Sequence, residues 1–136
     1  MLFRSLLKTL EERGPSAVAD EMLPKLIGET TRRTQPEVTE QTRSLVLSSS
    51  TESIAGAIRA LMTRPDSTPL LSSIHVPTLI VVGDEDTVTP PDHAAAMQRG
   101  IPGSELVTIA GAGHLSNLEQ PVSFNAALAA FLDHRV

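Results

Sequence analysis

Two stretches of the C-terminal half decide the fold: residues 76–90 read VPTLIVVGDEDTVTP, and residues 105–121 read ELVTIAGAGHLSNLEQP. The run 77–82 is apolar, rich in β-branched side chains and without polar alternation, which predicts a strand buried on both faces. Residues 105–109 predict a second strand, and the segment 91–100 between them begins with proline and ends with glycine, as helices often do. The order strand, helix, strand, helix is typical of a parallel α/β sheet.

The last predicted element is a helix that begins at Pro121. We expect it to be buried through four side chains, which are Phe124, Leu128, Phe131 and Leu132. Residues 1–71, in contrast, predict only short amphipathic helices. Apolar stripes end at Gly14 and at Gly28, and Ser50 or Thr51 can cap a later helix.

The boundary between the two kinds of sequence lies in residues 64–73, where proline and serine predict a short linker. We therefore predict a helical segment, 1–71, and a C-terminal βαβα unit, 72–136. Two parallel strands alone leave apolar side chains uncovered and strand edges unpaired. We expect a second copy of the chain, or a missing piece, to complete the sheet.

Two polar loops follow the carboxyl ends of the predicted strands. The first holds Asp84, Glu85 and Asp86, and the second is the glycine turn 111–113 followed by His114. Ligands bind at the carboxyl edge of open α/β sheets, and adjacent parallel strands would bring these loops together. A carboxylate that accepts the imidazole N–H orients the ring, so that its other nitrogen can act as a general base.

These motifs resemble the C-terminal part of α/β-hydrolases of the esterase and 3-oxoadipate enol-lactonase type. The matching residues are 76–79 leading into 83–86, and 111–121. The resemblance implies that Asp86 is the acid and His114 the base of a catalytic triad, and that residues 1–71 are a helical cap segment. The fold that it implies is a partial α/β-hydrolase, with a cap segment followed by a two-strand parallel βαβα unit.

Other readings of the same residues stay open. The acidic loop could instead cap the following helix, and Asp84, Glu85 or Asp92 could replace Asp86 as the partner of the histidine. We expect the remaining histidines, His75, His93 and His134, to be solvated surface residues.

The nucleophile is not evident in the sequence. The strand-to-helix motif G-x-S-x-G that carries the serine in this family occurs nowhere in the 136 residues. Ser116 lies too close to His114 in sequence for an easy attack geometry, and the serines 48–50 are better explained as helix caps. An Asp–His pair could also activate water directly.

Composition excludes several other classes. The net charge is −5 and aromatic residues make up 2%, which argues against a nucleic-acid surface. The absence of cysteine excludes disulfides and thiolate sites. We also predict that the protein has no metal site, no organic cofactor and no membrane-spanning segment. We expect it to be a cytoplasmic protein.

Two functions follow from these patterns. The first is a truncated or reduced carboxylic ester hydrolase that acts on a small-molecule ester through Asp86 and His114. The alternative is a non-catalytic hydrolase fragment, which needs a missing N-terminal half or acts as an interaction module. In either case we predict self-association or a complementing half as the partner.

Overall fold

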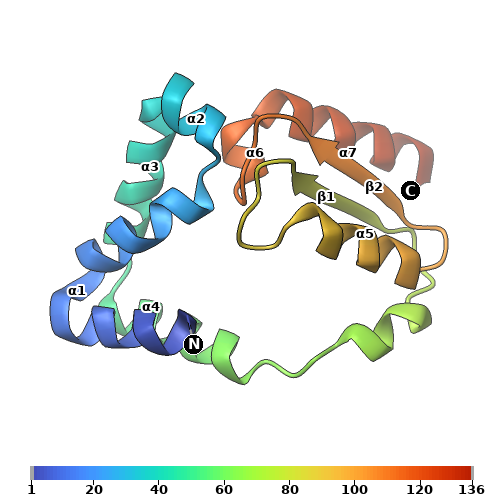
Figure 1. The fold of residues 1–136 in the computed structure, drawn as a ribbon. Coiled ribbons are helices and arrows are strands. Elements are labelled where there is room, and N and C mark those ends of the chain that lie inside the picture. The colour runs from blue at the N-terminus through green and yellow to red at the C-terminus, as the bar shows by residue number, and fades with distance from the viewer. Residues whose placement is uncertain (1, 136) are drawn as a thin grey trace.

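The computed structural model describes residues 2–135, and Figure 1 shows a helical group joined to an α/β group by an extended connection. The helical group consists of α1 (Leu2–Leu26), α2 (Glu29–Thr34), α3 (Pro36–Leu47) and α4 (Thr51–Thr63). A short 3-10 helix, η1 (Thr68–Ser73), lies in the connection that was expected to be a linker. The α/β group follows, with β1 (Leu79–Gly83), α5 (Pro91–Gly100), β2 (Glu105–Ile109), α6 (Ser116–Glu119) and α7 (Pro121–Arg135).

The ends of the helices follow local sequence signals. Gly14 has a left-handed φ of 78°, which interrupts α1 where the first apolar stripe was predicted to stop. Pro36 occupies the first turn of α3, where its missing N–H is not needed. The hydroxyl of Ser50 accepts the N–H of Ser53 at 3.1 Å, so Ser50 rather than Thr51 caps α4.

A core of apolar side chains holds α1 against α4. Its buried members come from both helices and are Leu6, Leu10, Val18, Ala55 and Ile58. This packing gives the short helices the tertiary support that isolated helices of their length lack in water.

The sheet consists, within residues 2–135, of β1 and β2 in parallel, in register from Leu79 opposite Glu105 to Gly83 opposite Ile109. On one face, Ile80 and Val82 pack with Ala94 of α5, and α7 packs on the opposite face. The register brings both strands to their carboxyl ends at the same level, so the loops that follow start side by side.

The first predicted strand is wrong in its start and in its burial. β1 begins at Leu79 rather than at Pro77. Ile80 and Val82 are buried, whereas Val81 is only half-buried. Pro77 lacks an N–H for pairing, and two strands offer each other too little cover to bury both faces.

The prediction of a buried final helix is also wrong in part. Leu128 is 39% exposed and Leu132 is 46% exposed, while Phe124 and Phe131 are half-buried. The two-stranded sheet is narrower than the apolar surface of α7, so part of that surface stays uncovered.

The two groups meet near the end of α1 and at α2, which Figure 1 shows beside the loops that follow β1 and β2. The backbone N–H of His114 donates to the carbonyl of Leu26 at 2.9 Å, and the Thr87 hydroxyl donates to the carbonyl of Lys25 at 3.2 Å. The helical group is therefore attached to the very loops that carry the candidate site. Within residues 2–135, none of the helices combines the length and the apolar character needed to cross a membrane.

Candidate active site

The loop after β1 folds around the carboxylate of Asp86. This side chain is 4% exposed. Its Oδ1 accepts the backbone N–H groups of Val88 at 2.8 Å and of Thr89 at 2.9 Å, and the Thr89 hydroxyl donates to Oδ2 at 2.8 Å. Because the carboxylate closes a turn of its own backbone, its direction is set by the loop.

The imidazole of His114 lies against this carboxylate. Its Nδ1 is 2.9 Å from Oδ2 of Asp86 and 3.2 Å from the hydroxyl of Thr89. The His114 side chain is 32% exposed, whereas that of Asp86 is almost fully covered. Nδ1 thus faces the protein, and among the side chains of residues 3–134 none makes a hydrogen bond to Nε2. Asp86 and His114 therefore meet, as the sequence predicted.

Close contact between the two loops depends on glycine. A Cβ on Gly83, the last residue of β1, would overlap the carbonyl oxygens of Ala112 and Gly113. The backbone N–H of Glu85 donates to the carbonyl of Ala112 at 2.9 Å, which ties the acidic loop to the glycine turn. Only residues without a side chain let these two backbones approach so closely.

The surroundings favour the ionised form of Asp86. Burial by itself would raise the pKa of this carboxyl group. The hydrogen bonds from the backbone and hydroxyl of Thr89, from His114 and from the N–H of Val88 outweigh it, and the pKa of Asp86 lies below its ordinary value. At neutral pH the histidine therefore faces a carboxylate anion.

The structure gives the competing acids other partners. Asp84 Oδ1 accepts the N–H of Gly111 at 2.8 Å. Glu85 accepts the hydroxyl and the N–H of Thr30 in α2, and these bonds lower the pKa of Glu85. Asp92 is exposed in the first turn of α5. Of the three carboxylates in the loop, that of Asp86 contacts the imidazole, that of Asp84 bonds to the glycine turn, and that of Glu85 bonds to α2.

A residue that the sequence interpretation missed, Glu119, lies directly behind the histidine. It is fully buried, and its carboxylate accepts the N–H groups of Gly28 at 2.8 Å, Gly113 at 2.9 Å and Leu115 at 3.1 Å. A sequence signal for one of these bonds existed, because an acid one turn into a helix often reaches back to N–H groups at the helix start. Nothing local could have indicated the bond to Gly28.

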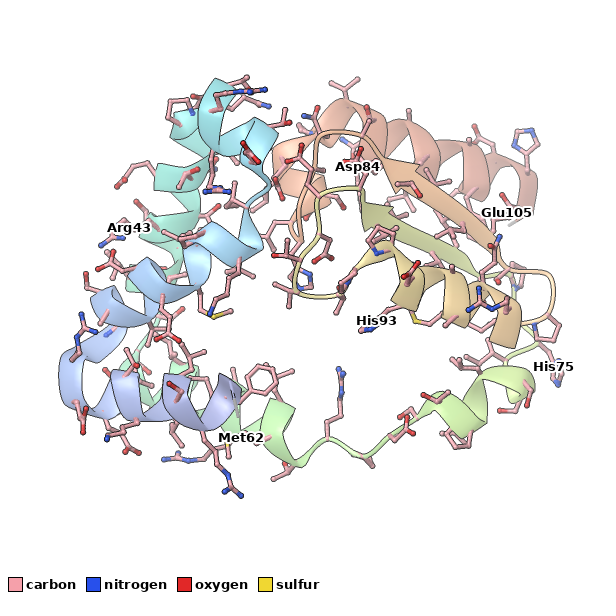
Figure 2. The ribbon with its side chains drawn as sticks, viewed as in Figure 1. Arg43, Met62, His75, Asp84, His93 and Glu105 are labelled. Carbon is pink, nitrogen blue, oxygen red and sulfur yellow. The ribbon has the colours of Figure 1, made fainter. Side chains whose placement is uncertain are left out.

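A cavity of about 130 Å³ opens beside the pair. His114, Asp86 and Thr89 line it together with His93, Met97 and Ser116. His93 is exposed, as predicted, as are His75 and His134. In the view of Figure 2, Asp84 lies above the strands and His93 below them, at the start of α5.

The structure does not supply an evident nucleophile from the described residues. Ser116 is buried, and within residues 2–135 no serine hydroxyl forms a hydrogen bond with His114. Ser50 is used as the cap of α4. In the same part of the chain, no group of three or more His, Cys, Asp or Glu side chains could hold a metal ion.

Comparison with known proteins identifies the family to which the chain belongs. A family model described as alpha/beta hydrolase fold matches residues 13–121. A 3-oxoadipate enol-lactonase from Acinetobacter baylyi is 40% identical over 78 residues, which cover 57% of this chain and 29% of the lactonase. This chain thus spans less than a third of that curated relative.

Two solved structures are similar over nearly the whole chain. A thermophilic esterase from Thermogutta terrifontis matches with a TM-score of 0.90 and 40% identity, covering 96% of this chain and 48% of the esterase. An enol-lactonase from Burkholderia xenovorans LB400 matches with a TM-score of 0.88 and 24% identity, covering 97% of this chain and 50% of the lactonase. At that identity the second match shows the fold alone. The chain spans about half the length of each.

Proposed function

Because this chain belongs to the alpha/beta hydrolase fold family, we propose that it carries the acid and the base of a carboxylic ester hydrolase. Asp86 is the orienting carboxylate and His114 the general base. The observation that carries this proposal is the 2.9 Å contact between Asp86 Oδ2 and His114 Nδ1, with Nε2 turned away from the carboxylate. The similarity to an esterase and to an enol-lactonase supports a carboxylic ester or lactone as the substrate class.

The geometry suits proton transfer at Nε2. With its proton on Nδ1, donated to Asp86, the neutral ring offers the Nε2 lone pair to a nucleophile's hydroxyl. As the nucleophile attacks the ester carbonyl, Nε2 takes the proton, and the Asp86 anion stabilises the resulting imidazolium. The ring then returns the proton to the departing alkoxide, which leaves as an alcohol. The positive charge on the ring lies beside a carboxylate whose pKa is already low.

We propose that the nucleophile is a serine hydroxyl from polypeptide outside these 136 residues, or else water. No G-x-S-x-G occurs in the sequence, and the described serines do not bond to His114. A water attack would be slower, because no covalent intermediate divides the reaction into two easier steps. In this proposal residues 1–71 act as a cap over the site.

The test is hydrolysis of a p-nitrophenyl ester by the chain alone and by the chain mixed with an N-terminal hydrolase half that carries G-x-S-x-G. We expect activity that is lost in both H114A and D86N. Equal rates for the wild type and both variants would refute the proposal.

The second candidate function is a fragment that is inactive until a complementing half joins it. The observation that favours it is the sheet, since β1 pairs within residues 2–135 only with β2 and leaves its other edge open. Activity that appears only in the mixture would support this alternative and a serine nucleophile outside the chain, whereas robust activity of the chain alone would exclude the alternative and support attack by water. Self-association through the same edge remains a prediction, and a single monomeric species in sedimentation experiments would contradict it.

A further inference from the structure

The segment that carries His114 is held at three consecutive backbone N–H groups. The N–H of Gly113 and that of Leu115 both donate to the Glu119 carboxylate, at 2.9 and 3.1 Å. The N–H of His114 itself donates to the carbonyl of Leu26 at 2.9 Å. The residues on both sides of the base are therefore bound by one buried side chain.

The same carboxylate reaches the helical group. Its Oε2 accepts the N–H of Gly28, 91 residues away in sequence, at 2.8 Å, and the N–H of Gly113 as well. A Cβ on Gly28 would lie 2.8 Å from the nitrogen of Gly113, so neither position has room for a side chain. One oxygen can bridge the two N–H groups because the backbones touch.

The environment of the Glu119 carboxylate is unusual for a side chain with a structural role alone. It is fully buried and, among the side chains of residues 3–134, it forms no ion pair with a cation. Burial of an ionised group is costly, and three N–H donors are its compensation. An amide could not replace it, because the NH2 group of glutamine would face one of the three N–H donors.

We propose that Glu119 is a positioning residue for His114, which holds the histidine backbone so that Nδ1 meets Asp86. This inference rests on the proposed function for its catalytic consequence, but the positioning itself can be measured without activity. The ring has no other anchor in the described chain than Asp86, Thr89 and its own backbone. A shift of the backbone at Gly113–Leu115 therefore moves Nδ1 directly.

The experiment compares E119Q with D84N in the full chain. Asp84 also accepts an N–H of the glycine turn, that of Gly111, but asparagine keeps the accepting oxygen. The control thus removes a negative charge beside the glycine turn without removing a hydrogen bond. The first readout is the NMR resonance of the His114 Nδ1 proton. The second is ester hydrolysis in whichever form of the protein is active.

We expect the Nδ1 proton signal to be lost or shifted in E119Q and unchanged in D84N. We also expect kcat to fall about 100-fold in E119Q with little change in KM, since a misplaced base slows the chemical step more than it weakens binding. Wild-type Nδ1 signals in a folded E119Q protein would overturn the proposal, and so would an equal change in D84N.

Two further outcomes are informative. An altered Nδ1 signal in E119Q, together with no ester hydrolysis by the wild type, would support positioning while rejecting the ester hydrolase function. If E119Q does not fold, E119D keeps the charge with a shorter reach and is measured in the same way. Failure of both variants to fold would assign Glu119 to folding and overturn the proposal.

Discussion

Replacement of Asp86 by asparagine is the sharpest test of the proposed acid–base pair, because the surrounding hydrogen bonds dictate how the amide must be oriented. Oδ1 accepts two backbone N–H groups, from Val88 and Thr89, so the amide oxygen has to stay at that position. The NH2 group then occupies the position of Oδ2 and points a donor at His114 Nδ1. The ring responds by moving its proton to Nε2, which is the nitrogen that must accept one.

The size of the effect follows from this tautomer change. A base with its proton on the wrong nitrogen, and without a carboxylate beside the imidazolium, loses about 10⁴-fold in kcat in serine hydrolases with this arrangement. That factor corresponds to roughly 5 kcal/mol in the activation barrier. Stability should change far less, because both backbone hydrogen bonds of the loop are kept.

The assay is ester hydrolysis by D86N, with NMR of the imidazole nitrogens to identify the tautomer and D84N as the matched control. Asp84 is exposed and bonds to Gly111, so D84N should retain the wild-type rate. The reasoning is refuted if D86N keeps its rate within tenfold of the wild type, or if D84N loses as much activity as D86N.

Three further predictions concern the same loops. T89V, an isosteric change, removes the hydroxyl that donates to Asp86 at 2.8 Å. The pKa of Asp86, followed by NMR, should therefore rise. An unchanged pKa would contradict the role of this hydrogen bond in lowering it. G113A should destabilise the fold by about 1–3 kcal/mol, because its Cβ would overlap the backbone of Gly28. G56A, whose Cβ would lie in open space on α4, should instead stabilise the fold by about 0.5–1 kcal/mol. Urea unfolding of both variants tests this contrast. Because the folded-state pKa of Asp86 is lowered, its ionised form contributes stability that is present above its unfolded pKa of about 3.9 and is lost as pH falls through the folded pKa. The difference in unfolding free energy between the wild type and D86N should therefore shrink below about pH 4. A constant difference down to about pH 2 would contradict this prediction.

The sequence was sufficient to predict which loops meet, and insufficient to predict how apolar segments are covered. Proline at the start of α5 and glycine at its end marked that helix correctly. The exposure of Leu128 and Leu132 was not predicted, because an apolar pattern indicates which side chains need to be buried and not whether a neighbouring element covers them. Cover depends on the width of the sheet, which is a property of the assembled elements.

For the site, the sequence alone was enough to predict that β1 and β2 are parallel, and that acidic residues follow one strand and a histidine follows the other. Those features arise from signals that act over a few neighbouring residues, such as β-branched runs and glycine turns. Only the tertiary structure showed that the competing acids Asp84 and Glu85 bond elsewhere, and that Glu119 bonds on both sides of His114. These choices depend on backbones that come together from Gly28 and Gly113, far apart in the chain, and hydrogen bonds between such segments leave no local pattern.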